Sequence, residues 1–177
     1  MTGSERSRWT VDLEGFDLGE NYGLARRRVS ALVRDLEDPF AIPVPACPGW
    51  TVHDVVAHLV AVVEDAVAGK LTGPPSDEVT REQVGRRRDM PTNEMLDEWA
   101  EICPPFQEGI QALRIWPGYL DVLAHEFDIR GAVANRDERD SFQIIASSEC
   151  LLSNWKPPVR VVVKTDQNSY PVGKGEV

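Results

Sequence analysis

Apolar residues at helical spacing, interrupted by proline and glycine, limit what this chain can fold into more than any other feature. They recur in steps of three and four within residues 18–36, 51–68, 92–113, 117–134 and 140–156. Such steps place apolar side chains on one face of each helix. Several amphipathic helices in one chain bury these faces by packing together. The pattern therefore predicts a mainly α protein that forms a helical bundle.

Capping residues and prolines indicate where these helices begin, end and bend. Thr51 is an expected N-cap, with Asp54 at the capping-box position three residues later. Gly69 follows the second apolar run and suits the end of that helix. Pro104 and Pro105 lie inside a helical pattern, so we expect one helix that is kinked there.

The charge of the chain argues against general binding to nucleic acid or to anionic membranes. The net charge is -10, whereas phosphate binding needs a basic surface. Two arginine runs, 26–28 and 86–88, have acidic neighbours and are expected to be solvated helix faces, the second in a short exposed helix at 78–89. No apolar stretch approaches the roughly 20 residues of a membrane span. Three widely spaced cysteines and the lack of a signal-peptide pattern predict a cytoplasmic location.

The C-terminal tail has a strand pattern instead of a helical one. The β-branched run Val159–Val163 and the segment Ser169–Val172, separated by turn residues, predict a short β-hairpin. A lone hairpin is only marginally stable in water. We therefore expect it to dock on the bundle, to pair with a second chain in a homodimer, or to begin a truncated second domain. The expected organisation is an N-terminal extension at 1–17, a helical bundle at 18–156 and a tail at 157–177.

Two histidines and an aspartate stand at positions suited to a metal site. His58 and His125 lie in the middle of predicted helices, and Asp121 precedes His125 by four residues, so that both project from one helix face. Such a pair can bind one metal ion, and a histidine from a facing helix would leave positions open for water or substrate. Two nitrogens and one carboxylate suit zinc, nickel or ferrous iron better than calcium or magnesium. A buried polar cluster without metal is the alternative.

Neighbouring residues are weaker candidates. Trp50 could form a wall of the site, or it could anchor the preceding loop. Arg130 could bind an anionic substrate or cofactor, or it could pair with Glu126 or Asp128. Glu126 and Asp128 could themselves orient the metal ligands.

Cys47 and His53 are expected to have no chemical role. Cys47 has no evident histidine partner apart from the proposed ligand, so we interpret it as a small packing residue. His53 lies in the first turn of its predicted helix, on a different face from His58, and is expected to be exposed.

Two segments resemble signatures of a known family. Residues 43–59, PVPACPGWTVHDVVAHL, are similar to the "CPGWTVRDVVAHL" signature of the mycothiol-dependent maleylpyruvate isomerase N-terminal family. Residues 121–132, DVLAHEFDIRGA, are similar to that family's "D-x-x-x-H-E-x-D-I-R-x-A". Residues 95–99 also match in place, and the resemblance extends from Tyr22 to about Arg139.

The resemblance implies a DinB-like four-helix bundle that holds a divalent metal, usually zinc, with nickel as the other candidate. Carried over to this chain, the ligands are His58, Asp121 and His125. The family also implies mycothiol as a thiol cosubstrate, which the metal activates to attack a small electrophile in an isomerase or S-transferase reaction. The better-studied isomerases have glutamate in place of Asp121. This difference weakens the inference of the named reaction more than the inference of a metal site. Because the family's full-length members add a second α/β domain, the alternative is a non-catalytic, metal-binding regulatory or interaction module.

Overall fold

The structure is a computed structural model that describes residues 11–137, 141–165 and 168–174. Within these ranges the chain forms six α-helices and one two-stranded antiparallel hairpin, which confirms the prediction of a mainly α protein. Its contacts divide it into two compact units, one of residues 17–137 and one of residues 1–16 with 138–177. In the described part of the chain, no helix combines the length and the apolar composition that a membrane crossing requires.

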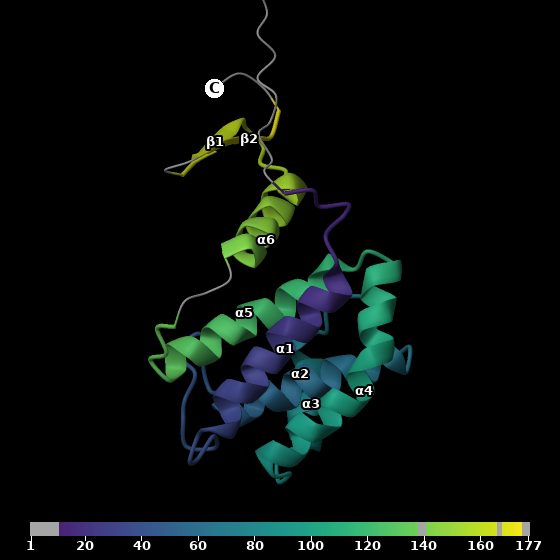
Figure 1. Ribbon diagram of the computed structural model, residues 1–177, viewed down its shortest axis with the longest axis vertical. Coiled ribbons are helices and arrows are strands. Elements are labelled where there is room, and N and C mark those ends of the chain that lie inside the picture. Colours follow the sequence, from purple (N-terminus) through teal and green to yellow (C-terminus); the bar gives the residue numbers. More distant parts are fainter. Residues whose placement is uncertain (1–10, 138–140, 166–167, 175–177) are drawn as a thin grey trace, which may run out of the picture. The chain divides into compact units, whose positions relative to one another are not determined.

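The larger unit is a helical bundle of the first five helices, whereas the bundle expected at residues 18–156 also included the last one (Figure 1). Helices α1 and α2 each pack against both α4 and α5, while the short helix α3 packs on α2. The four long helices thus enclose one core, as the amphipathic pattern requires. The five helices of this unit are α1 (Leu18–Arg34), α2 (Val52–Val67), α3 (Asp77–Arg86), α4 (Thr92–Ala112) and α5 (Trp116–Ala132).

Aromatic side chains from α1 and α4 fill much of this core. Trp99 is fully buried, and its Nε1–H donates a hydrogen bond of 3.1 Å to the hydroxyl of Tyr22. The Tyr22 ring also meets Phe106 edge-on, with the ring centroids 5.0 Å apart. Each such ring buries roughly 150–250 Å² of surface, which stabilises the fold by about 4–6 kcal/mol before the entropy of ordering is subtracted.

The expected helix ends are confirmed. The Thr51 backbone N–H donates to Asp54 Oδ2 at 2.8 Å, and the Asp54 N–H donates to Thr51 Oγ1 at 3.3 Å, which is a complete capping box. Gly69 follows the end of α2 with φ of 69°, a conformation that glycine adopts without strain. Helix α4 continues through Pro104 and Pro105, and Figure 1 shows it changing direction along its length.

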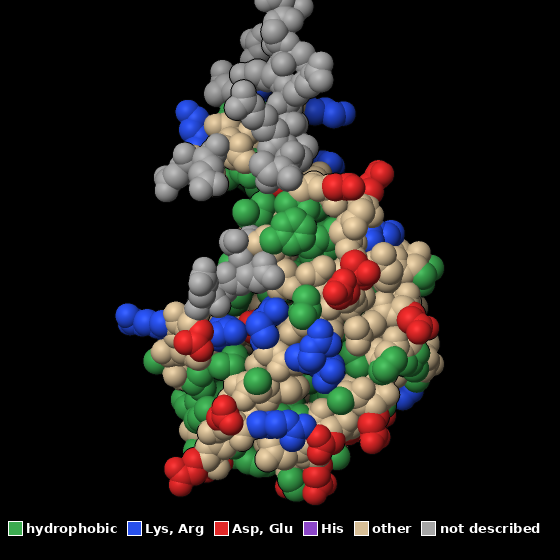
Figure 2. Space-filling view, viewed as in Figure 1, with side chains coloured by type: hydrophobic (Ala, Val, Ile, Leu, Met, Phe, Trp, Pro, Cys, Tyr) green, Lys and Arg blue, Asp and Glu red, His purple; other side chains and the backbone are tan. Residues whose placement is uncertain are grey.

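The prediction of solvated arginine runs holds for Arg27 and Arg88, which are exposed, but it was wrong for Arg87. Arg87 is only 6% exposed, and its Nη2 lies 3.1 Å from Glu64 Oε2. Arg86 pairs with the buried Asp65 at 2.6 Å, and Arg28 pairs with Glu126 at 2.7 Å. These partners belong to other helices, so the local sequence around the arginines does not reveal them. Elsewhere on the bundle, Figure 2 shows acidic and basic side chains interspersed over the visible face.

The smaller unit contains α6 (Ser141–Asn154) and a hairpin of β1 (Val161–Lys164) and β2 (Ser169–Val172). The strands are antiparallel, with Val161 opposite Val172, so the predicted hairpin is confirmed. Helix α6 contacts β2, and the Tyr170 hydroxyl donates a 3.1 Å hydrogen bond to the buried Glu149. The hairpin therefore contacts a helix of its own unit through β2. The domain boundaries expected after residues 17 and 156 stay a prediction.

Candidate metal centre

The three candidate ligands come from two helices that pack against each other in the bundle. His58 lies on α2, while Asp121 and His125 lie one turn apart on α5. Nε2 of His58 is 3.7 Å from Asp121 Oδ2, and Nε2 of His125 is 3.8 Å from Asp121 Oδ1. One donor atom from each residue lies within 4.8 Å of the others. Each carboxylate oxygen thus faces one imidazole.

Burial of the cluster decreases from His58 to Asp121. The exposed fraction of the side chain is 6% for His58, 16% for His125 and 32% for Asp121. The histidines are therefore largely desolvated, while the carboxylate keeps contact with water. Asp121 is thus the most exposed of the three candidate ligands.

The ring orientation of His125 is fixed by Asp128, one turn further along α5. Nδ1 of His125 lies 2.9 Å from Asp128 Oδ2. An ionised carboxylate only accepts hydrogen bonds, so the imidazole carries its proton on Nδ1 and donates it. When the ring is neutral, its lone pair is on Nε2, which faces Asp121. Asp128 therefore has the orienting role that the sequence suggested for it.

His58 is oriented by a residue that the sequence analysis did not identify, Gln83 of α3. Nδ1 of His58 is 3.2 Å from Gln83 Oε1, and Gln83 Nε2 donates to Asp65 Oδ2 at 2.9 Å. Because the Asp65 carboxylate accepts only, the Gln83 amide nitrogen must face it, and the amide oxygen must face His58. His58 therefore donates from Nδ1, and its neutral form has the lone pair on Nε2.

Asp65 is itself held in its charged form. Its burial acts to raise the pKa, but hydrogen bonds from Arg86 and Gln83 outweigh this and lower the pKa of the carboxyl below its usual value. Gln83 is fully buried between these groups. The sequence carries little sign of this arrangement, because Gln83 lies in a highly charged segment and 25 residues from His58.

The donor set fits a divalent metal ion. Both imidazoles donate from Nδ1 to protein acceptors and point Nε2 at the same carboxylate, as metal-binding histidines do in other proteins. Around a tetrahedral zinc ion, nitrogen and oxygen ligands at their usual bond lengths lie about 3.4 Å apart. The observed separations of 3.7 and 3.8 Å need only small movements to reach this value. The role of these residues as ligands stays a prediction.

Trp50 and Arg130 differ in their relation to the centre. The Trp50 ring lies against both imidazoles, with centroid distances of 5.4 Å to His58 and 6.3 Å to His125, as expected of a wall. The buried Arg130 forms the ion pair that was its alternative role, donating from Nε to Glu126 Oε1 at 2.9 Å. Glu126 also accepts two hydrogen bonds from Arg28, so it joins α1 to α5.

The expectation that His53 is exposed was wrong. Its exposed fraction is 1%, and its ring stacks on Phe40 with a centroid distance of 3.7 Å. Nε2–H donates to the Arg87 carbonyl at 3.2 Å, and Nδ1 accepts from the Thr92 hydroxyl at 2.9 Å. Burial lowers the pKa of His53, so the ring is a neutral packing residue. The covering segments come from elsewhere in the chain, which helix position alone does not show.

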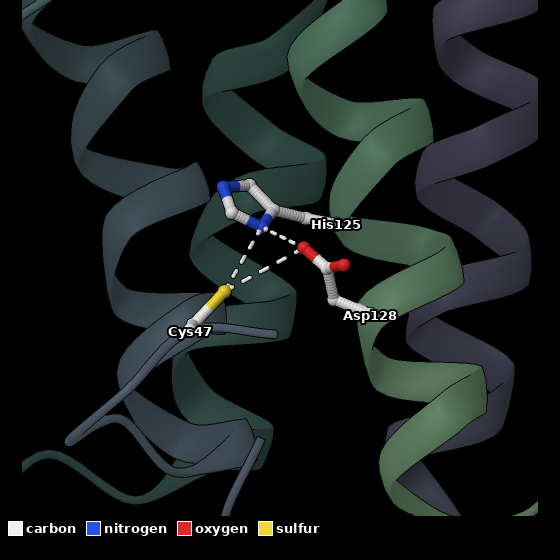
Figure 3. A group of neighbouring side chains, drawn as sticks. All are labelled: Cys47, His125 and Asp128. Atoms are coloured by element: carbon white, nitrogen blue, oxygen red, sulfur yellow. Dashed lines mark hydrogen bonds and ion pairs between the residues drawn. The ribbon is translucent and has the colours of Figure 1, made fainter. Parts of the chain in front are cut away.

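Cys47 has polar partners that its interpretation as a packing residue did not include. Its thiol donates to Asp128 Oδ2 at 3.5 Å, and Sγ lies 3.9 Å from His125 Nδ1 (Figure 3). Burial and the negative charge of Asp128 raise the pKa of this thiol to about 11. The loop that carries it is closed by a β-bridge between Pro43 and Thr51. Cys47 is therefore a protonated thiol at neutral pH, held beside the candidate centre.

Comparison with known proteins identifies the family. The family model of the mycothiol maleylpyruvate isomerase N-terminal domain matches residues 22–118, more than half of the chain, and the chain belongs to this family. The matched region includes His58 and ends just before Asp121 and His125. The family is associated with mycothiol and with metal binding. No curated protein and no solved structure matches the chain.

Proposed function

We propose that this member of the family holds a divalent metal ion at His58, Asp121 and His125 and uses it to activate a small thiol. The observation that carries the proposal is that the Nε2 atoms of both histidines face Asp121, while an acceptor lies beside each Nδ1. Family membership supports mycothiol as the thiol and a small electrophile as its target. The reaction would be an isomerisation or an S-transfer, with zinc the first candidate for the metal and nickel the second.

The chemistry follows from the donor set. A divalent ion at such a centre lowers the pKa of a thiol that binds to it and so supplies a thiolate nucleophile at neutral pH. Asp121 contributes the negative charge that offsets part of the ion's charge. Gln83 and Asp128 keep the two imidazoles in the binding tautomer. Trp50 keeps water away from one side of the imidazoles, while the partly exposed Asp121 marks the side from which a thiol could enter.

The surroundings of the centre suit this role. Cys47 is protonated and therefore a poor competitor for the activated thiol as a nucleophile. A reducing cytoplasm, where we place the protein, would keep Cys47 and the small thiol from forming a disulfide.

Metal analysis of the chain, purified without a histidine tag, tests the proposal. We expect nearly one zinc or nickel ion per chain in the wild type and its loss in His125→Ala. The matched control is His53→Gln, which removes a buried histidine that has other partners, Thr92 and Arg87. A wild-type chain that binds no metal when zinc is offered would refute the proposal.

A second measurement separates catalysis from metal binding alone. The metal-loaded chain is mixed with mycothiol and an electrophile such as maleylpyruvate, and turnover is compared between wild type and Asp121→Asn. Turnover that requires both thiol and metal supports an enzyme. Bound metal without turnover would leave the non-catalytic metal-binding module as the function.

A further inference from the structure

A second group of potential metal ligands lies beside the candidate centre and shares one residue with it. Cys47, His125 and Asp128 offer Sγ, Nδ1 and a carboxylate oxygen within 4.8 Å of one another. Figure 3 shows the cysteine reaching in from a loop and the other two side chains from one helix, all pointing toward one another. All three residues are half-buried, so each keeps some contact with solvent.

The spacing of these atoms is close to that of a tetrahedral metal site. Around zinc at its usual bond lengths, sulfur lies about 3.6 Å from nitrogen and from oxygen, and nitrogen about 3.4 Å from oxygen. The observed distances are 3.9 Å from Sγ to Nδ1, 3.5 Å from Sγ to Oδ2 and 2.9 Å from Nδ1 to Oδ2. The last pair would have to separate slightly as an ion replaces the proton between them.

The two groups use opposite nitrogens of His125. The candidate centre uses Nε2 and requires the proton on Nδ1, whereas the second group uses Nδ1 and requires the proton on Nε2. A neutral imidazole has one lone pair, so it can serve only one of the two positions at a time. Asp121, which lies 3.8 Å from Nε2, would then face a protonated nitrogen.

We propose that Cys47, His125 and Asp128 form a second position for a thiophilic cation, exclusive with the position at His58, Asp121 and His125. A sulfur, nitrogen and oxygen donor set favours soft ions such as cadmium or cuprous copper over the ions preferred by two nitrogens and an oxygen. Binding releases the thiol proton of Cys47 to solvent and moves the ring proton of His125 from Nδ1 to Nε2. The inference shares His125 with the proposed function but does not require thiol turnover.

Cadmium titration of the full chain, in buffer free of added thiols, tests the second position. We expect one bound cadmium ion per chain together with a near-ultraviolet sulfur-to-cadmium charge-transfer band. The band should disappear in Cys47→Ser. It should persist in the matched control Cys150→Ser, which replaces a cysteine of the smaller unit. It should also persist in Asp121→Asn, which removes a ligand of the first position only. Asp128→Asn, which replaces a charged ligand oxygen by a neutral amide, should weaken cadmium binding.

The outcomes separate this inference from the proposed function. Metal bound without a sulfur band would overturn the second position and leave the first intact. A band that persists in Cys47→Ser would also overturn it, and two cadmium ions per wild-type chain would overturn the exclusivity. Cadmium-113 NMR of the wild type gives an answer that needs no variant, because a thiolate ligand moves the resonance far downfield. An upfield resonance typical of nitrogen and oxygen ligands would contradict the proposal.

Discussion

Replacing Gln83 by leucine tests how the structure prepares His58 for metal binding. The substitution keeps the volume of the side chain but removes the acceptor of His58 Nδ1 and a donor to Asp65. His58 can then adopt the other tautomer or rotate, and the fraction of chains that present Nε2 to Asp121 falls. Loss of such an orienting partner weakens metal binding by about 10–100-fold, or about 1.4–2.8 kcal/mol.

The assay is competition for zinc between the chain and a chromophoric chelator at pH 7. Glu82→Gln is the matched control, because this neighbouring residue of α3 is exposed. Far-UV circular dichroism and urea unfolding show whether the variant is folded, since two buried hydrogen bonds are also lost and should cost about 1–3 kcal/mol each. A folded Gln83→Leu chain with the zinc affinity of the wild type would refute the argument that Gln83 sets the tautomer of His58.

Three further predictions concern stability. Glu126→Ala leaves Arg28 and the buried Arg130 without their shared carboxylate. It should lower the free energy of unfolding in urea by about 3–5 kcal/mol. The control is the exposed Glu108→Ala, and an equally small loss in both variants would contradict the role of this ion pair. Thr51→Ala removes the capping box of α2 and should cost about 1 kcal/mol in the same assay, while Thr51→Ser should cost little; equal losses in both would argue against the cap. Burial lowers the pKa of His53 in the folded state, so the unfolded chain binds more protons at acidic pH. The contribution of the neutral His53 to stability should therefore be fully present above pH ~6.5 and should fall as the pH drops toward the folded pKa. His53→Gln should lose less stability than wild type between pH 7 and pH 5, and parallel pH profiles would refute this assignment.

The elements with local signals could be predicted from the sequence. The capping box of Thr51 and Asp54 was predicted from their three-residue spacing alone. The β-branched run of the tail was predicted to be a strand, and most of it lies in β1. Asp121 and His125 share a helix face because they are four residues apart. Their meeting with His58 was predicted from the facing-helix argument and the family resemblance together, and the structure brings the three side chains close.

What the sequence could not reveal depends on contacts between distant segments. Gln83 looks like one more polar residue of an exposed helix, yet packing of α3 on α2 buries it against His58. His53 stands in a first helical turn, where exposure is usual, but Phe40 and Thr92 cover it from two other segments. Arg87 finds its acidic partners on α2 and α4. Periodicity describes one element at a time and carries no information on which polar side chains meet.

The position of Gln83 on α3 makes the folding of that short helix part of metal recognition. Helix α3 has 10 residues, which is too short to be stable as an isolated helix in water, so its structure depends on docking against the rest of the bundle. Coupling between two equilibria is reciprocal. The factor by which docking of α3 raises the affinity for the ion therefore equals the factor by which the bound ion favours the docked helix. Amide hydrogen exchange along α3 would thus report occupancy of a centre to which this helix contributes no ligand.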